Sequence, residues 1–451
     1  LTISPAQGDI TVGTAAVPQG AAAAPVTITS GSGLTVEATK SGDINVTGKL
    51  VTADDATVEG ITTGDVNVKT AAGDIVLNYG TGDDKDVVNS SKAALVQTGA
   101  GDIDVTGNVI GATTATLDGK EGHVNLTGNL TANNGLAKIQ AYDEAEAAES
   151  NDDGNITVKG NVVSDTDGVT ITTTNGDITV GTAEATPGAV KAAKALEIST
   201  AGTGDVTVNG NLKTTGADYG TVTVKSTEGK VILNKYGSVA GTATSADYVI
   251  DSGKDIVITA INVDNPTASD TEGDIDINDS LNAAGAVTVH AYKADDVATS
   301  KGDINIDGNV TAGTAVDIAA STGNVTIGGT TASNVQAGTG LAVKTLTDGD
   351  VAVTGQLVTT GADASTVTVQ ATEGNVTLTK SGSADEVIKS AKDVSISASD
   401  SGAADENVGD ILVKGNVTSA KAGVEISTSN GDIALGTNTP STGAVAITAA
   451  T

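Results

Sequence analysis

The sequence predicts an all-β protein, a parallel β-helix (β-solenoid) of roughly twenty coils with acidic loop insertions. Three observations carry this prediction. A short unit of glycine turn, strand and second glycine turn recurs along the chain, longer blocks repeat on top of it, and Phe, Trp, Met and Cys are all missing. Self-similarity with a period of about 20–50 residues is typical of solenoids and other repeat architectures.

The recurring unit is clearest in Gly302-Asp303-Ile304-Asn305-Ile306-Asp307-Gly308, and copies of it begin at Gly42, Gly101, Gly122, Gly154, Gly204, Gly349 and Gly409. Glycine adopts backbone angles that other residues resist, and we expect the Asp or Asn after it to close the turn with its own side chain. Apolar residues then alternate with polar ones, which is typical of a strand with one buried face. Val206, Ile304 and Val351 are therefore predicted to be buried.

Successive copies are often about 20–30 residues apart, which is too short for a propeller blade of about 40–50 residues and fits a coil of three short strands. Tandem β-sandwich domains are the rival fold. They predict aromatic-anchored units of about 100 residues, and the sequence shows neither the aromatics nor that period.

A longer repeat organises the chain into one continuous solenoid over residues 1–451. Residues 205–233 align without gaps on 350–378, with 19 of 29 positions identical. The motif Gly8-Asp9-Ile10-Thr11-Val12-Gly13-Thr14 returns at 176–182 and, more loosely, at 431–437. We interpret these matches as super-repeats near 8–175, 176–322 and 323–451, the last one truncated.

The composition limits the core and the partners. A narrow solenoid interior has room for stacked Val, Ile, Leu and Ala, and these are the residues that the predicted strands contain. The net charge is −33, and every basic residue is Lys. Nucleic acid is therefore not expected as a partner, because its phosphates need a basic face. No apolar run approaches the roughly 18 residues of a membrane span, so no membrane insertion is expected. An acidic, highly soluble surface suits an extracellular protein.

Acidic insertions are the candidate ligand sites. They lie at 141–153, 262–272, 292–301 and 399–408, each before a turn of the recurring unit, and we expect them to emerge from the same corner of the coil. Hard cations prefer several oxygen ligands, so the calcium candidates are Asp152, Asp153, Asp270, Glu272 and Asp274. The alternative is that these acids cap turns and face water. No other cofactor is expected.

Catalytic residues are not predicted, and we expect the protein not to be an enzyme. His123 and His290 are the two histidines, and we interpret both as solvent-facing substitutions in the repeat. A carbohydrate-active β-helix enzyme needs paired carboxylates and often basic partners and aromatic platforms. Carboxylates are plentiful here, but Arg and Trp are missing.

The two ends of the sequence read as ordinary strands in mid-pattern. The chain starts at Leu1-Thr2-Ile3-Ser4 and its last strand is expected near Ala444–Thr448. Unpaired strand edges invite pairing with another chain. We therefore expect either further coils of the same polypeptide or another subunit to complete the stack. The missing Met favours a processed chain or a segment of a longer one.

The repeats at 101–109, 302–310 and 409–417, with Gly-Asp-Ile-x-Val followed by Gly-Asn-Val, resemble those of filamentous haemagglutinin-type exoproteins. The resemblance implies a right-handed parallel β-helix in the shaft of a bacterial surface adhesin, with a role in adhesion or matrix formation such as biofilm. It also implies host or neighbouring-cell glycans or proteins as partners. The leading hypothesis is a non-enzymatic extracellular fibrous protein at the bacterial cell surface. The alternatives are a filament subunit that polymerises end to end and a carbohydrate-active β-helix enzyme.

Overall fold

The structure is a computed structural model that describes residues 1–13, 25–52, 64–79, 85–142, 154–181, 188–215, 220–234, 248–261, 273–293, 300–329, 331–361, 365–381, 385–400, 408–436 and 446–449. The described residues form two compact units, the first ending at Thr223 and the second starting at Val224. Strand β23 (Val222–Ser226) contains this boundary. That the whole chain forms one continuous solenoid stays a prediction.

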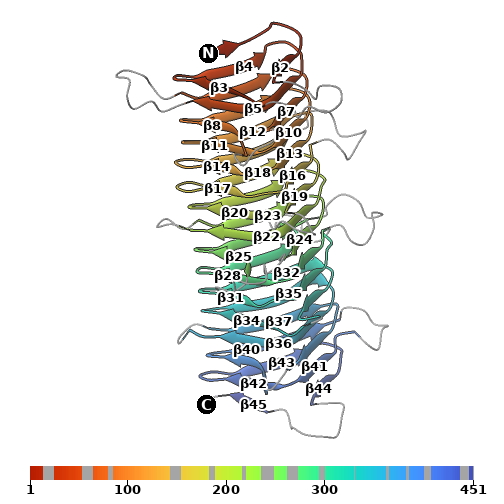
Figure 1. Ribbon diagram of the computed structural model, residues 1–451. Helices are drawn as coiled ribbons and strands as arrows, with labels where there is room; N and C mark the ends of the chain where they lie inside the picture. The colour runs from red at the N-terminus through yellow and green to blue at the C-terminus, as the bar shows by residue number, and fades with distance from the viewer. Residues whose placement is uncertain are drawn as a thin grey trace. The chain divides into compact units, whose positions relative to one another are not determined.

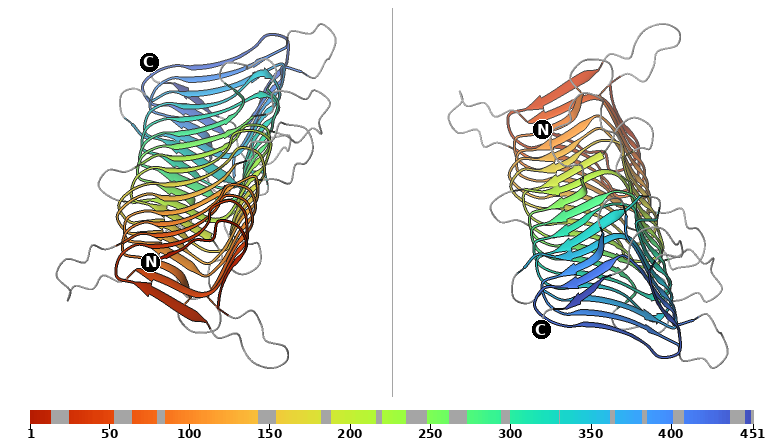
Figure 2. Two further views of the ribbon diagram at one scale, coloured as in Figure 1. Left: turned by 90° about the horizontal axis from the view of Figure 1, so that it is seen from above. Right: turned by 90° about the horizontal axis from the view of Figure 1, so that it is seen from below.

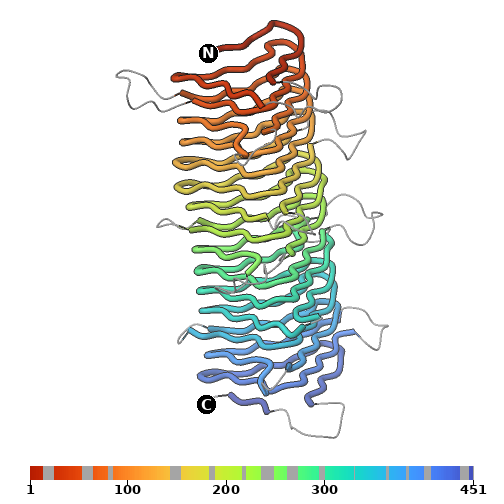
Figure 3. Tube along the Cα trace, viewed as in Figure 1, coloured from red at the N-terminus to blue at the C-terminus, as the bar shows by residue number. Residues whose placement is uncertain are grey.

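Each unit is a parallel β-helix, as predicted. The chain runs through a strand on face A, a strand on face B and a strand on face C, and then returns to face A one coil further on. Within a unit each strand pairs in parallel with the strand of the same face in the neighbouring coil, as Ile103 does with Val124. The stacked strands are visible in Figure 1, and the path of the chain can be followed in Figure 3.

In the first unit, face A consists of β1 (Thr2–Ile3), β4 (Leu34–Ala38), β6 (Val66–Thr70), β9 (Ala94–Thr98), β12 (Ala115–Lys120), β15 (Ala137–Tyr142), β18 (Val169–Thr173) and β21 (Leu196–Thr200). Face B consists of β2 (Ile10–Val12), β5 (Ile44–Thr52), β7 (Ile75–Asn78), β10 (Ile103–Thr106), β13 (Val124–Thr127), β16 (Ile156–Val158), β19 (Ile178–Val180) and β22 (Val206–Thr214). Face C consists of β3 (Val26–Ser30), β8 (Asp86–Ser90), β11 (Asn108–Gly111), β14 (Leu130–Ala132), β17 (Val162–Ser164) and β20 (Gly188–Ala192), together with the second halves of β5 and β22.

In the second unit, face A consists of β26 (Ile256–Ala260), β29 (Val287–Ala291), β32 (Val316–Thr322), β35 (Leu341–Asp348), β37 (Val367–Thr372), β40 (Val394–Ser399) and β43 (Val424–Thr428). Face B consists of β24 (Val231–Asn234), β27 (Ile275–Ile277), β30 (Ile304–Ile306), β33 (Val325–Ile327), β36 (Val351–Thr359), β38 (Val376–Thr379), β41 (Ile411–Lys414) and β44 (Ile433–Leu435). Face C consists of β25 (Tyr248–Ser252), β28 (Ser280–Ala283), β31 (Val310–Ala312), β34 (Ser333–Ala337), β39 (Glu386–Ser390), β42 (Asn416–Ser419) and β45 (Ile447–Ala449), together with the second half of β36.

Among the residues that the structure describes, face A carries sixteen strands, fewer than the roughly twenty coils expected from a uniform period of about 20–30 residues. The reason is that coil length varies. Ile103 pairs with Val124, 21 residues later, whereas Val231 pairs with Ile275. The longer coils contain the inserted segments.

The interior is a set of aliphatic columns, one residue per coil. Val206, Ile304 and Val351 are fully buried, which confirms the predicted register. Inward residues alternate with outward polar ones along each strand, as in Ile304-Asn305-Ile306. Since each Val, Ile or Leu contributes about 1.5–3 kcal/mol when buried, many equal layers replace one large core. Figure 2 shows the coils of each unit from above and from below.

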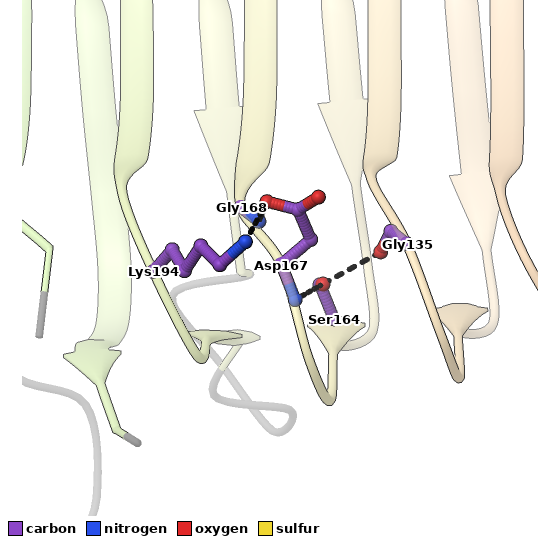
Figure 4. Close-up of polar contacts among 5 residues, drawn as sticks. All are labelled: Gly135, Ser164, Asp167, Gly168 and Lys194. Atoms are coloured by element: carbon purple, nitrogen blue, oxygen red, sulfur yellow. Dashed lines mark hydrogen bonds and ion pairs between the residues drawn. The ribbon is translucent and has the colours of Figure 1, made fainter. Parts of the chain in front are cut away.

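Hydroxyl side chains close the corner between faces C and A. Ser164, at the end of β17, is fully buried, and its Oγ donates to the Gly135 carbonyl oxygen at 2.7 Å and accepts from the Asp167 N–H at 3.1 Å. Asp167 Oδ1 accepts from the Gly168 N–H at 2.9 Å and lies 3.5 Å from Lys194 Nζ (Figure 4). The buried polar groups of this corner therefore find their hydrogen-bond partners within the corner itself.

The acidic insertions share one position in the coil. Each connects a face-A strand to the following face-B strand: β15 to β16, β26 to β27, β29 to β30, and β40 to β41. This agrees with the prediction of a common corner. Most of their residues lie outside the described part of the chain, so their protrusion stays a prediction. Among the described residues, no helix is long and apolar enough to cross a membrane.

Candidate functional site

The corner between faces A and B gathers the polar groups that the sequence singles out. Here the Asp or Asn after the turn glycine of many coils accepts a hydrogen bond from the backbone N–H of its counterpart in the next coil. Asp43 Oδ1 accepts from Asp74, Asp74 Oδ1 from Asp102, and Asp102 Oδ1 from His123, at 2.8–3.0 Å. We call these side chains the turn ladder. The expectation that each side chain closes its own turn is wrong, because the acceptor reaches along the stack.

The second unit repeats the turn ladder with mixed carboxylates and amides. Asp303 accepts from the Asn324 N–H at 2.6 Å, Asn324 from Asp350 at 2.9 Å, and Asp350 from Asn375 at 2.7 Å. Both residue types offer one oxygen to one N–H, which explains why Asp and Asn exchange freely at this position. The turn ladder therefore links the coils on top of the strand pairing.

Asp274 is the one calcium candidate within the described residues; Asp152, Asp153, Asp270 and Glu272 lie outside them. It precedes β27, and its Oδ1 accepts from the Asp303 N–H at 2.8 Å. Burial raises the pKa of Asp274 to about 6, and the charges of Asp303 and Asp276 act in the same direction. The Asp303 hydrogen bond and the Lys230 charge oppose this rise in pKa.

Asp274 is thus a rung of the turn ladder. Calcium prefers six to eight oxygen ligands, which calls for several converging side chains. Within the part of the chain that the structure describes, no three His, Cys, Asp or Glu side chains group in a way that could hold a metal ion. The calcium prediction for the remaining four residues is untested.

His123 takes an Asp position in the turn ladder. Its backbone N–H donates to Asp102 Oδ1, and its ring Nδ1 accepts from the backbone N–H of Asn155 at 3.3 Å. An imidazole nitrogen can replace the carboxylate oxygen because it also carries a lone pair. The predicted substitution in the repeat is correct, but the side chain has a structural partner rather than only solvent.

His290 belongs to a polar cluster on face A of the second unit, which the sequence did not reveal. Its Nε2 lies 3.0 Å from Asp317 Oδ2, and Asp317 Oδ1 lies 3.0 Å from Lys344 Nζ. The ring stacks on Tyr292 with centroids 4.7 Å apart. His290 takes an outward position on β29, as expected, but its contacts with Asp317 and Tyr292 leave the side chain only 21% exposed.

Burial by itself would raise the pKa of Asp317, but hydrogen bonds and positive charge from His290 and Lys344 outweigh it and hold that pKa below its ordinary value. Burial, together with the Asp317 charge, raises the pKa of Tyr292. The cluster therefore keeps a carboxylate ionised between two basic groups, which is the arrangement of a structural ion-pair network.

A polar groove of about 280 Å³ lies on the first unit, at the ends of four neighbouring face-A strands. Glu37, Lys69, Gln97 and Lys120 line it, one from each of β4, β6, β9 and β12. Among the described residues that line it, Glu37 is the single carboxylate. Glycoside hydrolysis uses two carboxyl groups about 5–10 Å apart, and the described lining residues supply one.

The turn ladder of the described residues thus joins each coil to the next by hydrogen bonds. No family model, curated protein or solved structure that we compared with the chain matches it.

Proposed function

We propose that the chain is a non-enzymatic structural protein, the shaft of an extracellular fibre or adhesin at a bacterial surface. One observation carries the proposal: the residues that define the repeat are those that join one coil to the next. The turn glycine, the following Asp or Asn, and the inward aliphatic all act on the neighbouring coil. A sequence that repeats its coil-to-coil contacts is suited to building a long stack of coils that resists being pulled apart.

The turn ladder supports a mechanical role. Pulling two coils apart breaks the parallel strand bonds and also the bond between Asp303 and Asn324 or its equivalents. These bonds lie in parallel between the same two coils, so they are loaded together. The net charge of −33 keeps such a shaft soluble and discourages lateral aggregation.

The proposed partners follow from the same role. Further coils of the same polypeptide or other subunits would extend the shaft, and glycans or proteins of a host or neighbouring cell would be its ligands. The acidic charge and the resemblance to haemagglutinin-type exoproteins support an extracellular location.

Single-molecule stretching of the chain between two handle domains tests the proposal. We expect stepwise unfolding in which each coil of 21–44 residues releases about 70–160 Å of chain. The double variant Asn324→Ala/Asn375→Ala removes two acceptors of the turn ladder and is expected to lower the unfolding force of the second unit. Thr326→Ala, an outward position on β33, is the matched control.

Release of reducing ends from any member of a panel of polysaccharides would instead favour the carbohydrate-active alternative. Unfolding at forces far below those of the handle domains would contradict the mechanical role.

A further inference from the structure

The polar groove at the ends of β4, β6, β9 and β12 is hollow because small residues lie in its middle. Ala71 follows β6, Gly99 follows β9, and both line the groove. A methyl group at Gly99 would overlap the Ala71 carbonyl oxygen, so the close approach of the two backbones keeps this position free of a side chain. Four neighbouring strands about 4.8 Å apart give the groove a length of about 14 Å.

The longer side chains of the groove alternate in charge and hydrogen-bonding character. The strand register sets Glu37 opposite Lys69, and Lys69 opposite Gln97. Lys120 ends β12, the next face-A strand. A ligand that lies along the groove therefore meets a carboxylate, an ammonium group, an amide and a second ammonium group in turn.

The two lysines of the groove are free to bind a ligand. Among the described residues, neither Lys69 nor Lys120 forms an ion pair, whereas Lys344 on face A of the second unit lies 3.0 Å from Asp317. Rotation of the side chains could join Glu37 to Lys69, but an exposed ion pair is worth little and a ligand can replace it. Acidic residues outnumber lysines by 56 to 23 in this chain. Two unpaired ammonium groups in one groove therefore favour an anionic ligand.

The groove is largely preformed. Thr70, one of its lining residues, donates its hydroxyl to the Gly42 carbonyl oxygen at 2.9 Å, which ties the end of β6 to the next turn. Gln97 Nε2 donates to Asp118 Oδ2 at 2.7 Å, which fixes the amide and leaves its Oε1 without a partner among the described residues. Binding therefore has to order only the long side chains, which lowers its entropic cost.

We propose that this groove binds an anionic saccharide, a short run of sugar rings that carry carboxylate groups. Lys69 and Lys120 pair with the carboxylates, and Glu37 and Gln97 accept hydrogen bonds from the hydroxyls. Sugar hydroxyls both donate and accept, so the alternating groups suit a saccharide better than an acidic peptide. The described lining residues include no aromatic ring, so we expect a dissociation constant on the order of 1 mM.

This inference rests on the proposed function, in which glycans are ligands of the shaft, and it adds the class of glycan and its place on the coils. Isothermal titration calorimetry with trigalacturonate, checked by ligand-observed NMR, tests it on the whole chain. Salt of about 0.1 M screens the more distant acidic residues, because charges act over about 10 Å at that concentration. Trigalacturonate methyl-esterified at every carboxylate is the neutral reference and is expected not to bind.

Variants identify the groove as the site. Lys69→Gln/Lys120→Gln removes both ammonium groups and is expected to raise the dissociation constant by at least about tenfold. Ala71→Leu, at an exposed position, fills the hollow while it keeps both charges, and it is expected to weaken binding by a similar factor. Lys92→Gln, an exposed lysine before the other end of β9, is the matched control and is expected to bind like the unmodified chain.

The inference is overturned if trigalacturonate does not bind, if its methyl ester binds equally well, or if an acidic peptide of the same charge binds more tightly. A loss of binding in Lys92→Gln as large as in the double variant would also overturn it. If the chain binds no saccharide but still unfolds stepwise under high force, the structural role stands and only the groove assignment fails. If it binds trigalacturonate but unfolds at low force, the mechanical role fails and the site stands.

Discussion

At the scale of single residues, the turn before β30 leaves no room for a side chain. A methyl group at Gly302 would overlap the Gly273 carbonyl oxygen, and Gly302 has a φ of +151°, which other residues rarely adopt. The close approach of the two backbones is what lets the Asp303 N–H reach the Asp274 carboxylate. The glycine and the acid of the repeat therefore serve one contact.

Gly302→Ala is expected to destabilise the second unit by about 2–4 kcal/mol, because the backbone must shift to relieve the overlap. Chemical denaturation measures the loss. Gly340→Ala is the control, since a methyl group there meets no atom within 4 Å. If the two variants lose the same free energy of unfolding, the close approach of the backbones at Gly302 is not the cause of the destabilisation.

Asp274 makes stability depend on pH. Its pKa is about 6 in the folded chain and near 4 when unfolded, so the folded state binds more protons between these values. The stabilising contribution of the protonated form is therefore present below pH 4 and lost as the pH rises through 6. Asp274→Asn keeps an acceptor for Asp303 and is expected to raise the melting temperature at pH 7.5, with little change at pH 4.

The control for this pH effect is Asp350→Asn, at a rung of the turn ladder whose neighbours are the amides Asn324 and Asn375. A gain in melting temperature at pH 7.5 as large as that of Asp274→Asn would contradict the explanation by burial and like charge.

At the scale of strands, short three-residue segments suffice because each is covered on both sides by a strand with aliphatic residues at the same inward positions. Strand β30 lies between β27 and β33 and turns Ile304 and Ile306 inward. Ile304→Asp would bury an unpaired charge among aliphatic side chains and is expected to cost about 3 kcal/mol or more. Thr326→Asp, an outward position on β33, is expected to change stability little, and thermal unfolding monitored by circular dichroism compares the two.

The sequence was sufficient to predict such strands, because Ile304 stands at a fixed offset from a glycine that the backbone requires. It was not sufficient for the polar contacts between coils. The partner of Asp274 is 29 residues away, and Asp317 meets His290 and Lys344 from different coils. Insertions make coil length vary, and only the strand register shows which outward residues become neighbours.

At the scale of the whole molecule, like charges are stacked along the turn ladder. Asp9, Asp43, Asp74 and Asp102 occupy four successive coils of the first unit, about 4.8 Å apart for neighbouring strands. Since salt screens exposed charges over about 10 Å at 0.1 M, added sodium chloride is expected to raise the melting temperature of the chain. The variant Asp43→Asn/Asp102→Asn keeps both acceptors and should respond less to salt. If salt raises the melting temperature of this variant as much as that of the unmodified chain, the charge repulsion does not arise from these carboxylates.

The turn ladder also bears on how such a chain is made. Its hydrogen bonds join residues 21 to 35 positions apart, whichever part of the chain they lie in. Folding slows when contacts are distant along the chain, and β proteins are usually slow for that reason. Here contact order does not grow with length, because each finished coil is the template for the segment that follows it. The polypeptide can therefore fold vectorially, coil after coil, in the order in which the ribosome releases it.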